Sequence, residues 1–128
     1  MVNIRKAIAL LIVVGFFTVV ASASAVADSW VMVAKSTTTQ ERQYVDPDSI
    51  QVLEQIKGSP THIRLKTSWG FEADPDSLSV AMTEYLCQQS QYRDVVVNGK
   101  TTGDRWQPLG EDLLNRAAME YGCKSNTP

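Results

Sequence analysis

Two cysteines, Cys87 and Cys123, carry the most reactive side chains of this 128-residue chain. A redox-active motif places its cysteines two residues apart, and a zinc site needs further cysteine or histidine ligands. Neither pattern occurs here, and the two thiols would close a loop of 37 residues. In a small exported domain two such thiols usually pair. We therefore predict a structural disulfide between Cys87 and Cys123, which contributes about 3.5–4 kcal/mol to stability.

The first 27 residues have the three parts of a secretory signal peptide. A basic start precedes an apolar run from Ile8 to Val20, and small residues end at Ala27. We predict cleavage between Ala27 and Asp28, which leaves residues 28–128 as a single domain. The run is interrupted by small and polar residues and is shorter than the ~20 residues of a membrane span. No stable membrane anchor is therefore expected after cleavage, and the protein is expected in the periplasm, secreted or at the cell surface.

The charge of the chain argues against nucleic-acid binding. Two of the 12 basic residues leave with the signal and none of the 14 acidic residues does, so the remaining domain has a net charge of −4. Nucleic-acid binding needs a cluster of basic residues on one face or along one helix. The charges of this domain are interspersed instead, and we expect no nucleic-acid partner.

His62 is the only histidine, so any serine or cysteine hydrolase mechanism would have to use it. It follows a turn at the start of an expected strand, beside no acidic residue or nucleophile in the sequence. Such a histidine usually faces solvent, and each acidic residue is expected in a turn or on an exposed face. We therefore predict no catalytic residue, no metal site and no cofactor.

The sequence Asp-Pro-Asp-Ser occurs twice, at residues 46–49 and 74–77. Alternating carboxylates suit calcium, but an EF-hand loop also needs a glycine at its sixth position and a glutamate at its twelfth. Neither copy has these residues. Aspartates around a proline favour tight turns, so we predict two turns that interrupt strands.

Several short strands are expected before a single helix. Residues 63–68 alternate between apolar and polar types, which is typical of a strand with one exposed face. Asn98-Gly99 is a strong hairpin signal, and residues 111–121 have a helical pattern that Gly122 is expected to end. The other strands are expected near residues 30–34, 42–45, 50–56, 80–87 and 92–97. The pattern predicts an α+β domain, in which an antiparallel sheet of roughly six strands carries the C-terminal helix on one face, tied by the disulfide.

A candidate binding patch lies at the end of the fourth expected strand. Trp69 and Phe71 run into the polar turn that contains Asp74 and Asp76. Large aromatic residues beside a polar turn are harder to bury than those in mid-strand, and aromatic residues are favoured at binding hot spots. We predict that Trp69, Phe71, Asp74 and Asp76 form this patch.

The order of several short motifs is similar to that of a known family. Trp30 starts the first strand, residues 44–50 read Tyr-Val-Asp-Pro-Asp-Ser-Ile, and residues 84–87 read Glu-Tyr-Leu-Cys. Trp-Gln-Pro at 106–108 precedes a helix that ends in Tyr-Gly-Cys at 121–123. From about residue 29 to residue 124, the chain resembles the surface-adhesin protein E-like domains of bacteria.

The resemblance implies a twisted antiparallel sheet, with the C-terminal helix tied to one face by the Cys87–Cys123 bond. The founding member of the family is an outer-membrane lipoprotein that dimerises and binds host extracellular-matrix and plasma proteins. A protein partner and a homodimer are therefore what the resemblance implies for this chain.

Our first hypothesis is an exported, non-enzymatic binding domain with a role in adhesion to host or envelope proteins. The first alternative is an envelope assembly or structural factor that contacts another periplasmic protein. The second is a small hydrolase that uses carboxylates such as Glu84 or Asp94 in a surface cleft. An exposed apolar patch would favour binding or assembly, whereas a pocket with converging carboxylates would favour an enzyme.

Overall fold

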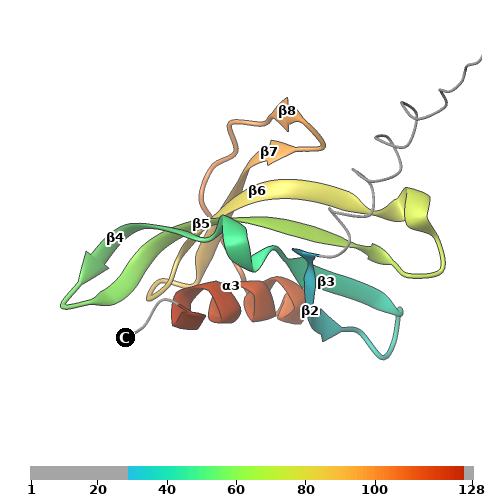
Figure 1. Ribbon diagram of the computed structural model, residues 1–128, viewed down its shortest axis with the longest axis horizontal. Helices are drawn as coiled ribbons and strands as arrows, with labels where there is room; N and C mark the ends of the chain where they lie inside the picture. Colours follow the sequence, from blue (N-terminus) through green and yellow to red (C-terminus); the bar gives the residue numbers. More distant parts are fainter. Residues whose placement is uncertain (1–28, 126–128) are drawn as a thin grey trace, which may run out of the picture.

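The computed structural model describes residues 29–125, which form one twisted sheet with a helix packed on it (Figure 1). The expected signal peptide, residues 1–27, and the cleavage site between Ala27 and Asp28 lie outside the described residues. The strands are β2 (Val31–Lys35), β3 (Glu41–Val45), β4 (Gln51–Ile56), β5 (Ser59–Phe71), β6 (Ser79–Leu86), β7 (Gln91–Val97), β8 (Lys100–Thr101) and β9 (Gln107–Pro108). The helix is α3 (Leu113–Ser125), and two 3-10 turns are η1 (Pro47–Ser49) and η2 (Pro75–Ser77).

Every strand pairing among the described residues is antiparallel. The strand order is β2-β3-β5-β6-β7-β8, while β4 pairs with β5 and β9 pairs with β7. α3 lies across one face of the sheet, in contact with β2, β3 and β5 (Figure 1). The predicted α+β fold, an antiparallel sheet with the C-terminal helix on one face, is therefore confirmed.

β5 is the central strand, and its 13 residues show the predicted alternation. Ile63 and Leu65 are fully buried in the core that the sheet shares with α3. Arg64 and Lys66 have their side chains on the opposite face, because successive residues of a strand point to opposite sides. We call the face under α3 the helix face and the other one the open face.

The first Asp-Pro-Asp-Ser copy bridges a gap along the edge of β5. β3 and β4 both pair with β5 and are separated by η1, which leaves Lys66 without a strand partner on that side. The backbone N–H of Asp46 donates to the Lys66 carbonyl at 3.1 Å, and the Ser49 hydroxyl oxygen accepts from the Lys66 N–H at 2.7 Å. The turn thus makes the two backbone hydrogen bonds with Lys66 that a neighbouring strand would otherwise make. Backbone N–H and C=O groups that are shielded from water are almost always paired in this way.

The second copy makes the same turn at the far end of β5. The Asp74 carboxylate accepts from the Asp76 N–H at 3.1 Å, and the Ser77 hydroxyl oxygen accepts from the Phe71 N–H at 2.9 Å. Gly70 lets this turn come close, because a Cβ there would lie 2.8 Å from the Ser77 carbonyl oxygen. Both copies are therefore turns, as their sequence predicts.

The helix differs in its bounds from the prediction of residues 111–121. Asp112 precedes its first residue, and the Asp112 carboxylate accepts from the Asn115 N–H at 3.1 Å as an N-cap does. The prediction that Gly122 ends the helix is wrong, since α3 continues to Ser125. A Cβ on Gly122 would lie 2.6 Å from Cδ1 of Ile63, so this glycine allows the helix to pack closely on β5.

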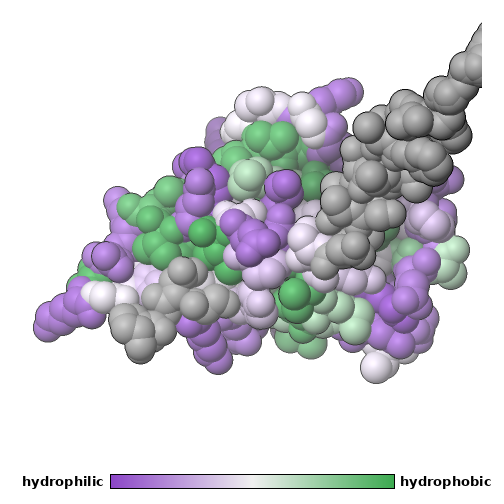
Figure 2. Space-filling view, viewed as in Figure 1, coloured by the Kyte–Doolittle hydropathy of each residue, from purple (hydrophilic) through white to green (hydrophobic). Residues whose placement is uncertain are grey.

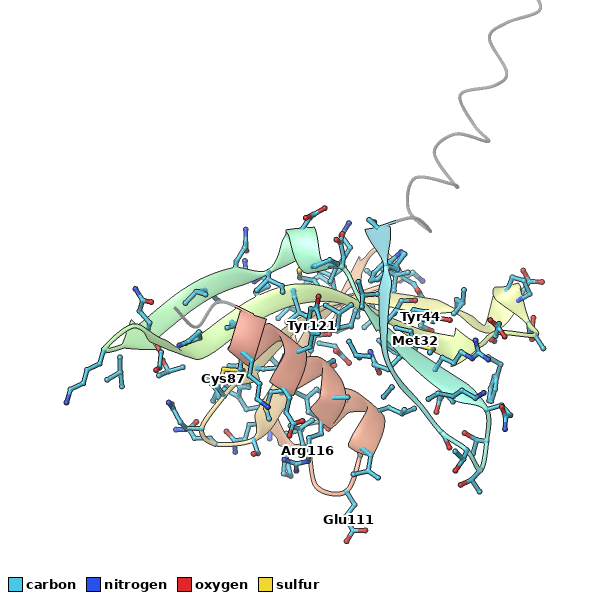
Figure 3. All side chains as sticks on the ribbon, turned by 60° about the horizontal axis from the view of Figure 1, so that its bottom comes forward. Met32, Tyr44, Cys87, Glu111, Arg116 and Tyr121 are labelled. Carbon is cyan, nitrogen blue, oxygen red and sulfur yellow. A yellow bond between two sulfur atoms is a disulfide. The ribbon has the colours of Figure 1, made fainter. Side chains whose placement is uncertain are left out.

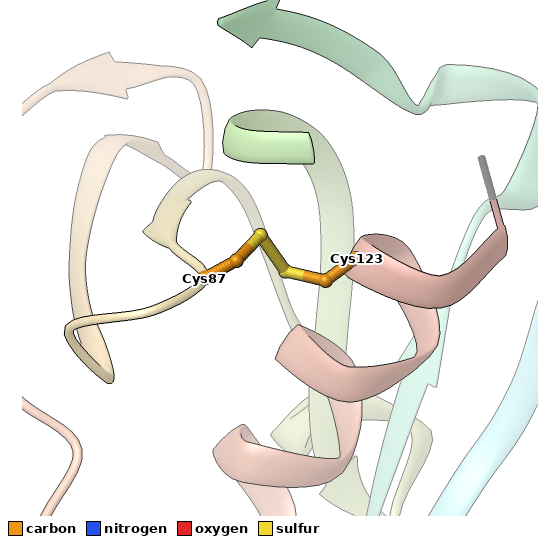
Figure 4. Close-up of a disulfide and its surroundings, with 2 residues drawn as sticks. All are labelled: Cys87 and Cys123. Carbon is orange, nitrogen blue, oxygen red and sulfur yellow. A yellow bond between two sulfur atoms is a disulfide. The ribbon is translucent and has the colours of Figure 1, made fainter. Parts of the chain in front are cut away.

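The predicted disulfide between Cys87 and Cys123 is confirmed (Figure 4). Its sulfur atoms are 2.03 Å apart and its Cα atoms 6.1 Å apart. Cys87 follows β6 and Cys123 lies in the last turn of α3, so the bond ties the helix to the sheet. Structural disulfides are typical of proteins exported to an oxidising compartment. Among residues 29–125, no helix has the length and apolar character needed to cross a bilayer.

Candidate functional site

A pocket of about 260 Å³ opens on the helix face, beside the N-terminal end of α3. Its walls come from β3, β5, β6, β7 and the start of the helix, and we call it the helix-side pocket. Acidic, amide, hydroxyl and aromatic side chains line it together with a single leucine. The lining residues are Glu41, Gln43, Thr67, Trp69, Thr83, Tyr92, Asp94, Asp112, Leu114 and Asn115.

Two buried threonines and an aspartate form a hydrogen-bonded chain across the pocket floor. The Thr83 hydroxyl donates to Asp94 Oδ1 at 2.8 Å, so its proton is committed to the carboxylate. The Thr67 hydroxyl lies 2.9 Å from the Thr83 hydroxyl and must therefore be the donor of that contact. Thr67 and Thr83 are each only 1% exposed. The chain fixes their orientation and leaves the Thr67 oxygen as an acceptor.

The pocket alters the acidity of two of its lining residues. Burial raises the pKa of Asp94 above 3.8; the hydrogen bond from Thr83 opposes this rise, and the charge of Asp104 adds to it. Burial and then the charge of Asp94 raise the pKa of Tyr92 above 10.0. Tyr92 is therefore uncharged at neutral pH, and it lies in the same pocket as a partly desolvated Asp94.

The predicted binding patch is divided between the pocket and the surface next to it. Trp69 lies in the pocket wall and is half-buried. Phe71 is 41% exposed at the end of β5, and Asp74 and Asp76 are exposed in the turn around η2. Of the four predicted residues, the structure places Trp69 alone in the lining of the pocket.

The open face carries a second polar cluster, centred on Glu84. The Glu84 side chain is 2% exposed and accepts hydrogen bonds from three basic residues of β5 and β7. Arg64 donates to Oε2 from Nε and Nη2 at 3.0 and 2.7 Å. Arg93 donates to Oε1 from Nε and Nη2 at 3.2 and 3.0 Å, and His62 Nε2 lies 2.9 Å from the same oxygen. We call these residues the Glu84 cluster.

These contacts hold Glu84 ionised. Burial alone would raise the pKa of Glu84, but the hydrogen bonds from Arg64, His62 and Arg93 outweigh it and lower the pKa to about 2. An ionised carboxylate can only accept, so His62 must carry a proton on Nε2. Two expectations are therefore wrong: Glu84 is not in a turn or exposed, and His62 does not simply face solvent. The cause is a register that pairs Arg64 and Arg93 with Glu84 across the strands.

Trp106 covers the Glu84 cluster from the loop that follows β8. The Arg93 guanidinium lies 4.4 Å from the centre of the indole ring, a cation–π contact. The His62 ring meets the same indole edge-on, at 5.4 Å between centroids. The cluster is thus a closed, mutually bonded unit that stabilises the open face.

Glu84 and Asp94, the carboxylates of the hydrolase alternative, are not brought together. Thr83 faces Asp94 across the β6–β7 pair, whereas Glu84 faces Arg93. Because neighbouring residues of a strand point to opposite faces, Asp94 lies in the helix-side pocket and Glu84 on the open face. Within residues 29–125, no group of three or more histidine, cysteine and acidic side chains is placed to hold a metal ion.

Apolar side chains are exposed in three further places. A shallow groove between β2 and α3 is lined by Met32 and Tyr121, which Figure 3 labels. Figure 2 shows apolar residues gathered over β4 and β5 and again over β7. Leu53 and Ile56 of β4 are 39% and 64% exposed.

Sequence reasoning found Trp69 but missed the rest of the helix-side pocket. A signal was present, because Thr67 and Thr83 are polar residues at positions of β5 and β6 that face the core. Their partner Asp94 could not be identified without the register of β6 and β7, which is shifted by a bulge next to Thr83.

Comparisons of the chain with protein-family models, curated proteins and solved structures find no match.

Proposed function

We propose that the protein is an exported, non-enzymatic binding domain of the surface-adhesin protein E-like kind, which acts in the periplasm or at the cell surface. Its partner is a protein, and its binding site is the helix-side pocket with the adjoining Phe71. A second copy of the chain is one partner that the family resemblance implies.

One observation carries this proposal: Trp69 is half-buried in the wall of a 260 Å³ polar pocket. Ligand-binding sites are typically preformed concavities with apolar and aromatic walls and a few fixed polar groups. The Thr67–Thr83–Asp94 chain links β5, β6 and β7 in the pocket floor, and the disulfide ties the other end of α3 to the sheet. Walls that are already fixed lose little conformational entropy when a partner binds.

The Glu84 cluster supports a role without catalysis. A carboxylate with a pKa of about 2 is a poor proton donor and a weak base at neutral pH. His62 is hydrogen-bonded to Glu84 and packed against Trp106 on the open face, so its ring does not reach the helix-side pocket. Glu84 also cannot act on one substrate together with Asp94, because the sheet separates them.

The hydrolase alternative rests on a specific observation in the same pocket. Asp94 has a raised pKa and shares the lining with Glu41 and Asp112. A perturbed carboxylate in a concave site is a feature of general acids. Turnover of glycoside, ester or peptide substrates that is lost in Asp94→Asn would establish this alternative and refute the non-enzymatic proposal.

Site-specific photo-crosslinking in the producing cell tests the binding proposal. A photoreactive phenylalanine analogue at Phe71, which is 41% exposed, should capture a partner. The same analogue at Ile56, which is 64% exposed on β4, is the matched control and should not capture it. Trp69→Ala should abolish capture from position 71 while it shifts the thermal midpoint by no more than ~5 °C.

The captured species also separates the remaining alternatives. A second copy of the chain indicates a homodimer, a host protein indicates adhesion, and an envelope protein indicates the assembly factor. Equal capture from positions 71 and 56, or capture that is unchanged in Trp69→Ala, would refute the helix-side pocket as the binding site. A collapse of stability in Trp69→Ala would show that Trp69 belongs to the core instead.

A further inference from the structure

We propose that the helix-side pocket binds an alkyl ammonium group, which is supplied by a lysine side chain of a partner protein or by a free polyamine. This inference rests on the proposed function and names the chemistry that the same pocket recognises. Three features of the pocket carry it: the formal charge of its walls, the direction of its hydrogen bonds and its aromatic surface.

The formal charge of the pocket is negative. Glu41, Asp94 and Asp112 line it, and none of the other seven lining residues is basic. Asp104 also acts on Asp94 from nearby. Carboxylates that share a partly desolvated space repel one another unless a cation joins them. A ligand with a positive charge would remove this repulsion.

The start of α3 does not reverse this charge. A helix N-terminus favours anions, because its first N–H groups are unpaired. Here Asp112 caps that end: its carboxylate accepts from the Asn115 N–H at 3.1 Å, and its carbonyl accepts from the Arg116 N–H at 3.0 Å. The cap uses the chain's own carboxylate, so the helix end needs no external anion.

Thr67, Thr83 and Gln43 of the pocket floor use their donors within the protein and leave acceptors to the pocket. The Thr83 hydroxyl donates to Asp94, and the Thr67 hydroxyl donates to Thr83. The Gln43 amide nitrogen donates to the backbone carbonyls of Ser68 and Tyr44, at 3.3 and 3.5 Å. The Thr67 oxygen and the carboxylates remain as acceptors, which suits a ligand with several N–H donors.

The aromatic and apolar surface suits an organic cation better than a metal ion. The rings of Trp69 and Tyr92 line the pocket, and cations are attracted to the faces of such rings. Leu114 offers apolar contact for a short alkyl stem. Across residues 29–125, no acidic, histidine or cysteine side chains converge closely enough to hold a metal. An ammonium group on a flexible chain can instead donate hydrogen bonds to acceptors that do not converge on one point.

Titration of the exported protein with pentylamine, followed by ¹H–¹⁵N correlation spectra at neutral pH, tests this proposal. The full chain is expressed and the protein is purified from the exported fraction. We expect shifts of the Thr67, Thr83 and Asp94 amides and of the Trp69 indole N–H. Pentan-1-ol has the same chain length without the charge, and we expect it to bind about tenfold or more weakly.

Variants of the acidic walls provide the matched comparison. Asp94→Asn and Glu41→Gln should each weaken pentylamine binding about tenfold, since each removes one charge-assisted hydrogen bond. Asn and Gln keep the shape and an acceptor oxygen, and Glu41→Gln lies outside the buried chain, so it tests the charge even if Asp94→Asn alters folding. Glu54→Gln, an exposed residue of β4, should leave binding unchanged.

Two arms identify the source of the ammonium group. Tighter binding of an N-acetyl-lysine methylamide than of cadaverine assigns the site to a partner's lysine, and the reverse order assigns it to a free polyamine. Equal binding of pentylamine and pentan-1-ol, shifts outside the pocket, or no binding of any amine would overturn the inference. If photo-crosslinking from position 71 still depends on Trp69 in that case, the proposed binding function stands and only the ammonium chemistry fails.

Discussion

Glu84→Gln tests whether the Glu84 cluster stabilises the fold through charge. The substitution keeps the size of the side chain and its acceptor oxygen but removes the negative charge that Arg64, Arg93 and His62 contact. The pKa of Glu84 falls from 4.5 to about 2 on folding. Because one pKa unit corresponds to about 1.4 kcal/mol, the ionised form contributes about 3 kcal/mol to the free energy of unfolding. Glu84 is 2% exposed, so solvent screening at the carboxylate itself is small.

The contribution of Glu84 to stability should depend on pH in a defined direction. A depressed folded-state pKa stabilises the protein above the unfolded value of 4.5, and this contribution is lost as the pH falls towards 2. Urea denaturation of the wild type should therefore show a decline in stability between about pH 5 and pH 2. Glu84→Gln should be about 3 kcal/mol less stable at pH 7, and the difference should nearly vanish at pH 2.

Glu120→Gln, at an exposed position of α3, is the matched control and should change stability by less than ~0.5 kcal/mol at either pH. An equal loss in Glu84→Gln at pH 7 and pH 2 would mean that shape, rather than charge, holds the cluster together. No loss at pH 7 would refute the assignment of a depressed pKa to this residue.

Three further substitutions test the packing of the helix and the interrupted strand. Gly122→Ala should lower the free energy of unfolding by about 1 kcal/mol in urea, because crowding against Ile63 outweighs the gain in helix propensity; higher stability would contradict this packing. Replacing Cys87 and Cys123 together by serine should lower the free energy of unfolding by about 3–4 kcal/mol and lower the thermal midpoint. Without the bond between these residues, which are 36 positions apart, the unfolded chain gains conformational entropy. Ser49→Ala should lower the free energy of unfolding by about 1–2 kcal/mol in the same urea assay, because it removes the hydroxyl that accepts from the Lys66 N–H of β5. An unchanged free energy would show that water takes the place of this hydroxyl.

Local sequence signals predicted the elements that depend on neighbouring residues. The alternation along residues 63–68 predicted the two faces of β5, and Asn98-Gly99 predicted the hairpin in which Val97 pairs with Lys100. The cysteine pairing also followed from the sequence, because only two thiols were present. These features need no knowledge of which strands are neighbours.

The candidate sites depended on information that local patterns do not contain. Glu84 is buried because Arg64 and Arg93 reach it from two different strands, and the pairing of those strands decides this. Gly122 looked like a helix stop, since glycine is common there, but here it permits close packing. Glu84 lies between Met82 and Leu86 on a face of β6 that is otherwise apolar, and this was the signal in the sequence that a charged partner lay opposite.

The position of α3 also has a consequence for how the chain acquires its structure during synthesis or transport. The helix is formed by the last described residues, yet it covers β2 and β3, which are formed by the first. Chains emerge from the ribosome N-terminus first. The apolar side chains of Val45, Ile63 and Leu65 therefore have no helix to cover them until nearly the whole chain has emerged. Such long-range closure slows folding, and until the helix docks, the helix face of the early strands is an apolar surface open to aggregation.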